Sequence, residues 1–133
     1  KESIAIGNET DGQSNEASGT QSIAIGFGNK VSGAHSGAIG DPNIVNGDNS
    51  YVVGNSSNVA DGLTDVFVLG NNVNVTGSNT VVLGSGSDGS ESNVVSVGAT
   101  GNERRITHVA PGKEATDAAT VGQVQEVAQG AYN

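Results

Sequence analysis

The chain of 133 residues has no cysteine, methionine or tryptophan, and only two phenylalanines and two tyrosines. The absence of cysteine excludes disulfide bridges, thiolate metal ligands and cysteine nucleophiles. With so few large side chains, the chain cannot fill the core of an ordinary compact domain of this length. Its apolar residues nevertheless come in regular, short, β-branched runs, which disordered sequences lack. We therefore expect its burial to be spread over many thin layers.

Basic residues are scarce as well, with five Lys and Arg against 14 Asp and Glu and a formal net charge of −9. Such a surface repels phosphate groups, so we expect neither nucleic acid nor an anionic membrane surface as a partner. No stretch approaches the roughly 20 apolar residues that a membrane span requires. The chain opens directly in a repeat with no signal peptide before it, so we expect it to be a segment of a longer protein.

A motif of three or four small or apolar residues followed by glycine recurs along most of the chain. Its glycines are separated by 19, 14, 14, 16, 14 and 14 residues, which indicates a period of 14 with two insertions. The seven instances are Ser3-Ile-Ala-Ile-Gly7, Ser22-Ile-Ala-Ile-Gly26, Ser36-Gly-Ala-Ile-Gly40, Ser50-Tyr-Val-Val-Gly54, Val66-Phe-Val-Leu-Gly70, Thr80-Val-Val-Leu-Gly84 and Val94-Val-Ser-Val-Gly98.

A second feature keeps the same register, because a valine follows the motif glycine by five residues in four repeats, at Val31, Val45, Val59 and Val75. Each repeat is therefore predicted to form two short strands joined by corners rich in Gly and Asn. The insertions, residues 11–20 and 61–65, are expected to bulge outward, since the strand pattern resumes after each of them.

The motif strand is apolar on both of its faces. The residues three and one before the glycine are mostly large, as in Ile4 and Ile6, while the residue between them is smaller. Neighbouring side chains of a strand point to opposite faces, so both faces should be buried. A two-strand layer encloses only one interior. We therefore expect the other face to pack against a further copy of the same chain.

The pattern changes after Gly98. Residues 104–112 begin like a strand and end in a Pro-Gly break, and an Ala-rich segment follows with a possible helix cap at Thr116 or Asp117. Beyond it, Val121, Val124, Ala128 and Ala131 are spaced by 3, 4 and 3 residues, which is the spacing of a heptad seam. So short a seam is also typical of one face of a surface helix.

These residues resemble those of a known family. The repeats resemble the 14-residue repeats of YadA-like heads in trimeric autotransporter adhesins, with their Ser-(Val/Ile)-Ala-(Ile/Leu)-Gly cores. The segments Arg105-Ile-Thr-His-Val-Ala-Pro-Gly112 and Thr116-Asp-Ala-Ala-Thr-Val-Gly-Gln-Val124 resemble the neck of that family, which is the more specific signature. The sequence departs from the family pattern at His108, Ala119, Thr120 and Val124, and Gly37 replaces a large strand residue, which is expected to thin its layer.

The resemblance implies an all-β fold, a left-handed parallel β-roll of 14-residue repeats assembled as a trimer, followed by a neck and a short trimeric coiled-coil start. It places the head at residues 1–100, the neck at 101–122 and the start of the stalk at 123–133. In the neck it implies contacts between subunits at Arg105, Ile106, His108, Val109, Thr116, Asp117 and Val121. We expect Arg105 to contact a carboxylate such as Asp117 of another copy.

The function that the resemblance implies is attachment of a bacterium to host cells or extracellular matrix. The chain would lie at the bacterial cell surface without touching the membrane, in a passenger region that a C-terminal barrel beyond this segment anchors to the outer membrane. The partners would be two further copies and a host receptor or matrix protein. Candidate ligand contacts are Phe27, Lys30 and His35, although a lone Phe is more often a corner filler. A spacer without a ligand of its own is the alternative.

Catalysis and metal binding find little support in the residues. The histidines His35 and His108 lie in different segments, and neither a His-Glu-Xaa-Xaa-His motif nor a complete Gly-Xaa-Ser-Xaa-Gly motif occurs. Asp-Gly pairs such as Asp61-Gly62 are typical turn residues, and the nine-residue period of calcium-binding repeats is absent. We expect no enzymatic activity, no cofactor and no metal site.

Overall fold

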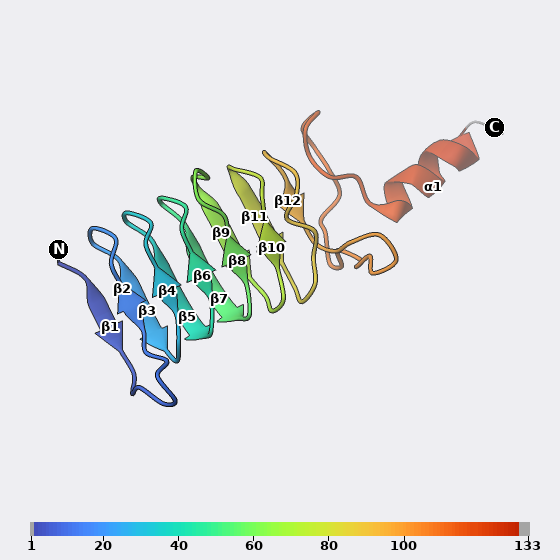
Figure 1. Ribbon diagram of the computed structural model, residues 1–133. Coiled ribbons are helices and arrows are strands. Elements are labelled where there is room, and N and C mark those ends of the chain that lie inside the picture. The colour runs from blue at the N-terminus through green and yellow to red at the C-terminus, as the bar shows by residue number, and fades with distance from the viewer. Residues whose placement is uncertain (1, 131–133) are drawn as a thin grey trace. The chain divides into compact units, whose positions relative to one another are not determined.

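The computed structural model describes residues 2–130 and divides the chain into two units, Lys1–Glu103 and Arg104–Asn133. The first unit is a stack of short parallel strands, a β-solenoid, and the second contains a single short helix, α1 (Val121–Gly130) (Figure 1). The all-β class and the parallel stacking predicted from the repeat are confirmed. Each unit is described by itself below.

The motif strands form one sheet of seven strands, all of them parallel, in the order β1-β3-β5-β7-β9-β11-β12. Their bounds are Ile4–Ile6 for β1, Ile23–Gly26 for β3, Gly37–Asp41 for β5, Tyr51–Asn55 for β7, Val66–Leu69 for β9, Thr80–Leu83 for β11 and Val95–Ser96 for β12.

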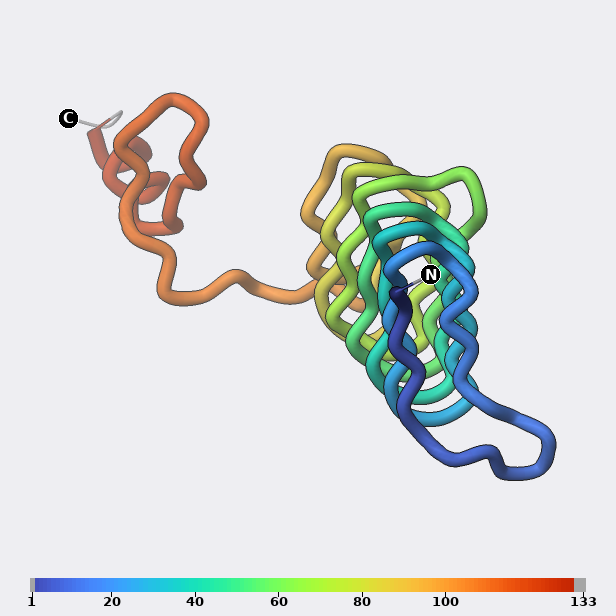
Figure 2. Tube along the Cα trace, turned by 90° about the vertical axis from the view of Figure 1, so that its left-hand side faces the viewer, coloured from blue at the N-terminus to red at the C-terminus, as the bar shows by residue number. Residues whose placement is uncertain are grey.

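The valines of the second strand position form a five-stranded parallel sheet in the order β10-β8-β6-β4-β2. Its strands are β2 (Glu16–Ala17), β4 (Lys30–Val31), β6 (Ile44–Val45), β8 (Asn58–Val59) and β10 (Asn74–Val75). One strand of each sheet and the two corners that join them make one layer. Viewed along the stack, successive layers lie over one another (Figure 2).

The interior of the stack lies between the two sheets and is lined by small side chains. The middle residues of the motif strands point inward, and the valines of the five-stranded sheet meet them from the other side. All of the following are less than 5% exposed: Ala24, Ala38, Val52, Val68 and Val82 from the first sheet, and Val31, Val45, Val59 and Val75 from the second. The core is therefore one side chain deep on each side.

The motif glycines stand where the backbones of neighbouring layers approach most closely. Gly40 has φ +137°, and a Cβ added to it would overlap the carbonyl oxygen of Gly54 in the next layer. The same overlap with the next layer recurs at Gly26 and Gly54. A side chain is excluded both by this approach and by the backbone conformation, which explains the strict glycine of the repeat.

Buried asparagines satisfy the backbone at the corner that follows the motif glycine. The Asn29 and Asn43 side chains are fully buried, and each lies three residues after a motif glycine. The Asn43 amide donates to Asn29 Oδ1 (3.1 Å) and to the carbonyl of Gly54 (2.7 Å), while its own Oδ1 accepts the N–H of Ser57 (3.0 Å). This column of side chains joins each layer to the next, as buried polar groups require.

Serines form a matching column at the opposite corner. Ser36 Oγ donates to the carbonyl of Gly47 (2.8 Å) and accepts the N–H of Ser50 (3.1 Å). Ser50 Oγ in turn accepts the N–H of Val66 in the following layer (3.1 Å). Among residues 2–130, no buried side-chain nitrogen or oxygen lacks a hydrogen-bond partner.

The prediction that residues 11–20 bulge outward is wrong for their second half. β2 pairs in parallel with β4, so it continues the five-stranded sheet. The extra residues form an exposed hairpin at 8–13, closed by two backbone hydrogen bonds between Thr10 and Gln13 (3.1 and 3.0 Å). Asn15 draws the chain back, because its Oδ1 accepts the N–H of Asn29 and so extends the asparagine column (3.1 Å). The hairpin, drawn in blue, projects beyond the other layers in Figure 2.

The second insertion also returns to the stack sooner than predicted. Asp61 and Gly62 are exposed in a turn, but Thr64 forms a parallel bridge with Asp48 of the previous layer. The N–H of Asp65 donates to the carbonyl of Asp48 (3.1 Å). Only the turn around Asp61 and Gly62 projects.

The layer that contains Gly37 is not thinned as predicted, because Tyr51 covers it. A Cβ added to Gly37 would lie 2.9 Å from Cδ1 and 3.0 Å from Cε1 of the Tyr51 ring. Gly37 is buried under that ring and pairs directly with Tyr51 in the sheet. The aromatic side chain of the next layer fills the space that a large residue at position 37 would occupy.

The helix of the second unit begins later than predicted, since Thr120 and not Thr116 or Asp117 caps it. Thr120 Oγ1 accepts the N–H of Gln123 (3.2 Å), and Gln123 Oε1 accepts the N–H of Thr120 (3.1 Å). This reciprocal pair is a capping box. Gln123 also bonds both the N–H (2.9 Å) and the carbonyl (3.0 Å) of Gly112, which fastens the Pro-Gly break to the first turn of α1.

The asparagine column should be essential to stability. Asn43→Ala would leave the N–H of Ser57 and the carbonyl of Gly54 without these partners inside the stack, and each such group costs about 1–3 kcal/mol. We expect the free energy of unfolding, from denaturant titration at fixed protein concentration, to fall by about 2–4 kcal/mol. Asn74→Ala, which removes an exposed amide from β10, is the control and should change it by less than about 0.5 kcal/mol. Equal losses in the two variants would contradict the assignment.

Candidate functional site

One large apolar surface is left uncovered by the solenoid. The residues three before each motif glycine, and those one before the first six of these glycines, point away from the interior, on the outer side of the seven-stranded sheet. They form two ladders, which together we call the apolar face. The first ladder is Ile4, Ile23, Gly37, Tyr51, Phe67, Val81 and Val95, and the second is Ile6, Ile25, Ile39, Val53, Leu69 and Leu83.

The apolar face is largely exposed in a single chain from Ile4 to Val95, although Gly37 is buried under the Tyr51 ring. Phe67 is 47% exposed, Leu69 60% and Ile39 47%. Scattered apolar side chains are normal on a protein surface, but a contiguous apolar patch marks an interaction site. The sequence predicts that both faces of the motif strand need cover. In the structure, the small residues of the strand face inward and the large ones face outward.

The outer side of the five-stranded sheet has the opposite character. Ser32 Oγ donates to Asn46 Oδ1 (2.7 Å), and Asn58 lies beside Asn74 in the sheet. Ile44 is the exception among its neighbours, a large aliphatic side chain that is 43% exposed. The two sheets therefore present one apolar and one polar surface, and only the polar one is suited to contact with water.

The three candidate ligand contacts lie at successive places along a single layer. Phe27 is half-buried in the corner that follows Gly26, Lys30 lies in β4, and His35 is exposed in the opposite corner. His35 has φ +54°, and its N–H donates to the carbonyl of Thr20 (2.8 Å). The structure does not bring the three side chains together at one point.

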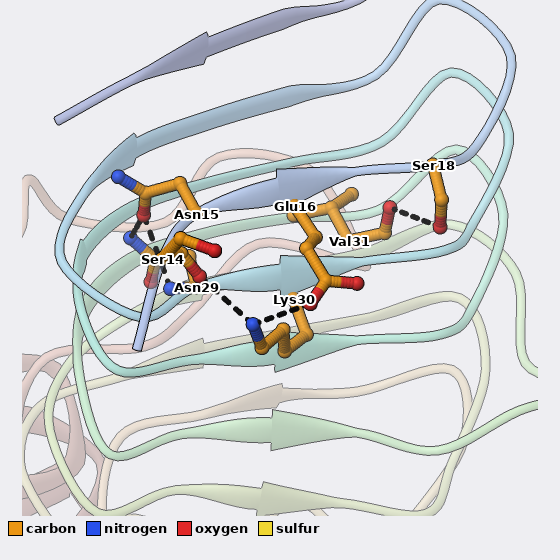
Figure 3. A network of polar contacts seen from close by, with 7 residues as sticks. All are labelled: Ser14, Asn15, Glu16, Ser18, Asn29, Lys30 and Val31. Carbon is orange, nitrogen blue, oxygen red and sulfur yellow. Dashed lines mark hydrogen bonds and ion pairs between the residues drawn. The ribbon is translucent and has the colours of Figure 1, made fainter. Parts of the chain in front are cut away.

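Lys30 takes part in a polar network with the segment that follows the hairpin (Figure 3). Its Nζ forms an ion pair with Glu16 Oε2 (2.6 Å) and donates to the carbonyl of Ser14 (2.8 Å). Both side chains of the pair are partly exposed, so its contribution to stability is modest. The pair holds β2 against β4 and thereby fixes the base of the hairpin.

Net charge is distributed very unevenly between the two units. Residues 1–103 hold 11 of the 14 acidic residues and two of the five basic ones, which gives this unit the whole net charge of −9. The remaining residues carry three charges of each sign and are neutral overall. A ligand that approaches the solenoid therefore meets a negative field, which favours a partner with exposed positive charge.

The predicted neck contacts all lie in the second unit. Ile106, His108, Val109 and Val121 line one groove, and Asp117 lines another, with Val124 and Val127 of α1. Arg105 and Thr116 are exposed. Ile106, Val121, Val124 and Val127 are each more than 60% exposed, so this unit too has apolar side chains that it does not cover itself. Ala131 of the predicted heptad seam and residues 131–133 of the predicted stalk lie outside the described residues.

Asp117 organises the turn that precedes α1. Its Oδ2 accepts the backbone N–H groups of Lys113 and Glu114, both at 3.0 Å, and the N–H of Asp117 donates back to the carbonyl of Glu114 (3.0 Å). The hydrogen bond from Lys113 and then that from Glu114 lower the pKa of the Asp117 carboxyl below its ordinary value, because both stabilise the charged form.

The spacing of three asparagines is a signal in the sequence for the asparagine column. Asn15, Asn29 and Asn43 are spaced by 14 residues and keep a fixed distance from the motif glycine in the second and third cases. Asparagine is so common in turns that this spacing alone indicates only corner residues. Only the structure distinguishes the buried asparagines from exposed ones such as Asn74.

Among residues 2–130, no group of three or more His, Cys, Asp or Glu side chains is placed so as to hold a metal ion. Within the same range, no helix has the length and apolar character needed to cross a bilayer.

Comparisons with known proteins agree with the geometry. Residues 17–41 match the family model of the YadA head domain repeat, in two copies. Residues 105–133 match the model of the coiled stalk of trimeric autotransporter adhesins. No curated protein matches the chain. Among solved structures, the collagen-binding domain of the Yersinia adhesin YadA is similar at 21% identity and a TM-score of 0.42, over 96% of this chain and 97% of that one.

A β-solenoid with head repeats, followed by a segment that matches the stalk, defines a surface-adhesin architecture. The matches over residues 17–41 and 105–133 support a trimeric autotransporter adhesin head and its connection to a stalk. The resemblance seen in the repeats and in the neck is confirmed.

The Asp117 turn should depend on pH in a defined direction. Because the pKa of Asp117 is lowered in the folded state, its contribution is complete above the ordinary aspartate pKa of about 4 and is lost as the pH falls through the lowered value. We expect NMR titration to give a midpoint for the Asp117 carboxyl below 3.8, with the amide signals of Lys113 and Glu114 following the same curve. In Asp117→Asn those amides should lose this titration. A midpoint at or above the ordinary value would exclude the arrangement.

Proposed function

We propose that the chain is the head and neck of an adhesin fibre that assembles as a homotrimer and attaches a bacterium to host cells or extracellular matrix. The observation that carries the proposal is the contrast between the two sheets: the apolar face needs cover by protein, whereas the opposite surface is polar. Similarity to the family supplies the number of copies and the biological setting.

Assembly through the apolar face follows from the cost of leaving that face in water. Each buried side chain of the size of Leu or Phe contributes about 1.5–3 kcal/mol. The thin interior holds only Ala and Val from the sheets, so one chain does not bury its own largest residues. Another copy presents an identical face with the same spacing between strands. Cyclic assembly of three copies would enclose all three faces around a common axis.

The second unit is proposed to continue this assembly into the stalk. We propose a head at residues 1–100, a neck at 101–122 and the start of a coiled coil at 123–133. The exposed Val121 and Val124 are suited to a seam between helices. We also propose that Arg105 contacts Asp117 of another copy: Oδ2 of that carboxylate accepts two backbone amides, and its other oxygen is available for a guanidinium.

Ligand contacts are proposed for the polar surface and its corners, because assembly covers the apolar face. Lys30 lies in the five-stranded sheet, Phe27 and His35 lie in the two corners of the same layer, and the hairpin at residues 8–13 projects beyond the other layers. The ligand would be a host receptor or matrix protein with basic groups that complement the acidic solenoid. Three copies would strengthen a weak single contact through multivalency. A spacer with no ligand is the second candidate, and the regularity of the layers favours it.

Two isoleucines provide a matched test of assembly. Ile39 on the apolar face is 47% exposed and Ile44 on the polar face is 43% exposed in a single chain. Ile39→Glu would place one carboxylate per copy within the proposed interface, so we expect light scattering to show loss of the trimer and the melting temperature to fall. Ile44→Glu should leave a trimer of three 13.1 kDa chains.

The wild-type result decides the proposal first. A stable monomer of 13.1 kDa would overturn assembly through the apolar face. If Ile44→Glu dissociated the oligomer and Ile39→Glu did not, the interface would lie on the five-stranded sheet.

Adhesion can be tested with the trimeric chain on immobilised matrix proteins and on host cells. We expect binding that weakens as salt rises, because the complementarity proposed is electrostatic. Deletion of residues 9–13 should reduce binding if the hairpin is the platform. This deletion restores the 14-residue spacing and leaves Asn15 three residues after Gly7, so the asparagine column should persist and the melting temperature should hold.

Two substitutions separate the hairpin from the other candidate contacts. His35→Asn copies the residue found at the same corner in the next layer, Asn49, which also has positive φ, so the fold should tolerate it. Lys30→Gln removes the charge that pairs with Glu16. Loss of binding in either variant would place the ligand along this layer. No binding by the intact trimer to any matrix protein or cell would favour the spacer.

A further inference from the structure

We propose that Gly37, Tyr51 and Phe67 form a register lock in the apolar face, which selects copies aligned at the same height and disfavours copies shifted by a layer. This inference rests on the proposed assembly and concerns how that assembly chooses its alignment. The occupant of the surface is a second copy of this chain.

A repetitive interface has an intrinsic ambiguity. The layers of the apolar face repeat at the strand spacing of about 4.8 Å, and most of its residues are aliphatic side chains of similar size. Sliding one copy along another by one layer would therefore bring Ile, Val and Leu against Ile, Val and Leu again. Registers that differ little in contacts are weakly specified unless some position is different.

The first ladder contains one such position. Along consecutive strands it reads Ile23, Gly37, Tyr51, Phe67 and Val81, so a residue without a side chain is followed by the only two aromatic residues of the apolar face. The Tyr51 and Phe67 rings are stacked, with centroids 5.8 Å apart and an interplanar angle of 21°. The Tyr51 ring covers Gly37. We call this glycine followed by two aromatic residues the step, and it occurs once along the stack.

A hollow lies beside the aromatic step. It has a volume of about 200 Å³ and is lined by Tyr51, Val53, Phe67, Leu69, Val81 and Leu83, so it bridges the two ladders. A cyclic assembly of three copies joins two different patches of each copy. We infer that the first ladder of one copy faces the second ladder of the next. At equal height, the rings of one copy would meet the aliphatic Val53 and Leu69 of its neighbour. A shift of one layer would bring Phe67 opposite Val53 or Leu83, and Gly37 opposite Ile25 or Val53. The order of large and small residues in the two facing ladders would then no longer match.

The proposal can be tested by asking which chains assemble together. A shifted variant moves both ladders by one layer, the first through Gly37→Val, Tyr51→Gly, Phe67→Tyr and Val81→Phe, and the second through Val53→Ile and Leu69→Val. It is co-expressed with the wild type as the full chain, under a different affinity tag, and each pull-down is analysed by mass spectrometry. We expect each tag to recover its own kind at least about tenfold above statistical mixing, which corresponds to about 1.4 kcal/mol of discrimination.

A control variant redistributes volume in the apolar face away from the step, through Ile4→Val, Ile6→Val and Val95→Ile, three positions that are exposed in a single chain. It should mix freely with the wild type, as two differently tagged wild-type chains do. Free mixing of the shifted variant would overturn the register lock, and so would self-sorting of the control variant, since selection would then come from packing in general. Wild-type chains that stay monomeric would instead defeat the proposed assembly.

A second measurement applies if the shifted variant fails to fold. Gly37→Val drives a side chain into the space that the Tyr51 ring occupies, so we expect the melting temperature of the trimer to drop by about 4 °C or more. Adding Tyr51→Val should recover most of that loss, because the valine leaves the space vacant. A neutral Gly37→Val, or a double variant no more stable than the single one, would exclude the fit between the two residues.

Discussion

The close approach of successive layers at the motif glycines is the constraint on which the rest of the structure depends. Position 40 requires glycine because the carbonyl of Gly54 lies where a Cβ would stand. Such an approach leaves no room for water between the corners, so the amides there need acceptors from within the chain. Asn29 and Asn43 supply them three residues later, and serines do so at the other corner. Glycine, asparagine and serine are thus parts of one solution.

A stack built this way is necessarily thin, and thinness determines where the large side chains go. The two sheets lie so close that the side chains between them are small, mostly Ala and Val. Phe, Tyr, Leu and most of the Ile residues of the motif strands are therefore on the outside, where one chain alone leaves them wet. The need for further copies is a consequence of the layer geometry and not an added feature. The same reasoning extends to the second unit. Its helix has an exposed apolar side and is held at its start by the capping box.

Periodicity was sufficient to predict the strands, the parallel stacking and the apolar character of both strand faces, because each follows from residue spacing. It was not sufficient where a side chain acts across layers. β2 returns to the sheet because Asn15 takes the corner position of the asparagine column and accepts the N–H of Asn29. Gly37 is covered because the Tyr51 ring lies over the preceding layer. The start of α1 was misplaced for a related reason, since Thr120 and Gln123 form a capping box while Asp117 caps an earlier turn. The positions of the candidate ligand contacts could be found, but the pattern carries no information on what they bind.

A regular repeat has two disadvantages, because its layers are alike to a ligand and to a partner chain. In this chain, departures from the repeat pattern address both. The first is that identical layers offer a ligand nothing distinctive; the hairpin at residues 8–13 introduces a distinct shape without breaking the asparagine column, since Asn15 resumes it. The second is that identical layers offer a partner chain no unique alignment. The gap at Gly37 and the rings of Tyr51 and Phe67 interrupt the aliphatic ladder once, and a single interruption is enough to make one alignment different from all others. Regular layers explain how the fold is built, and the irregular ones are where specificity is to be sought.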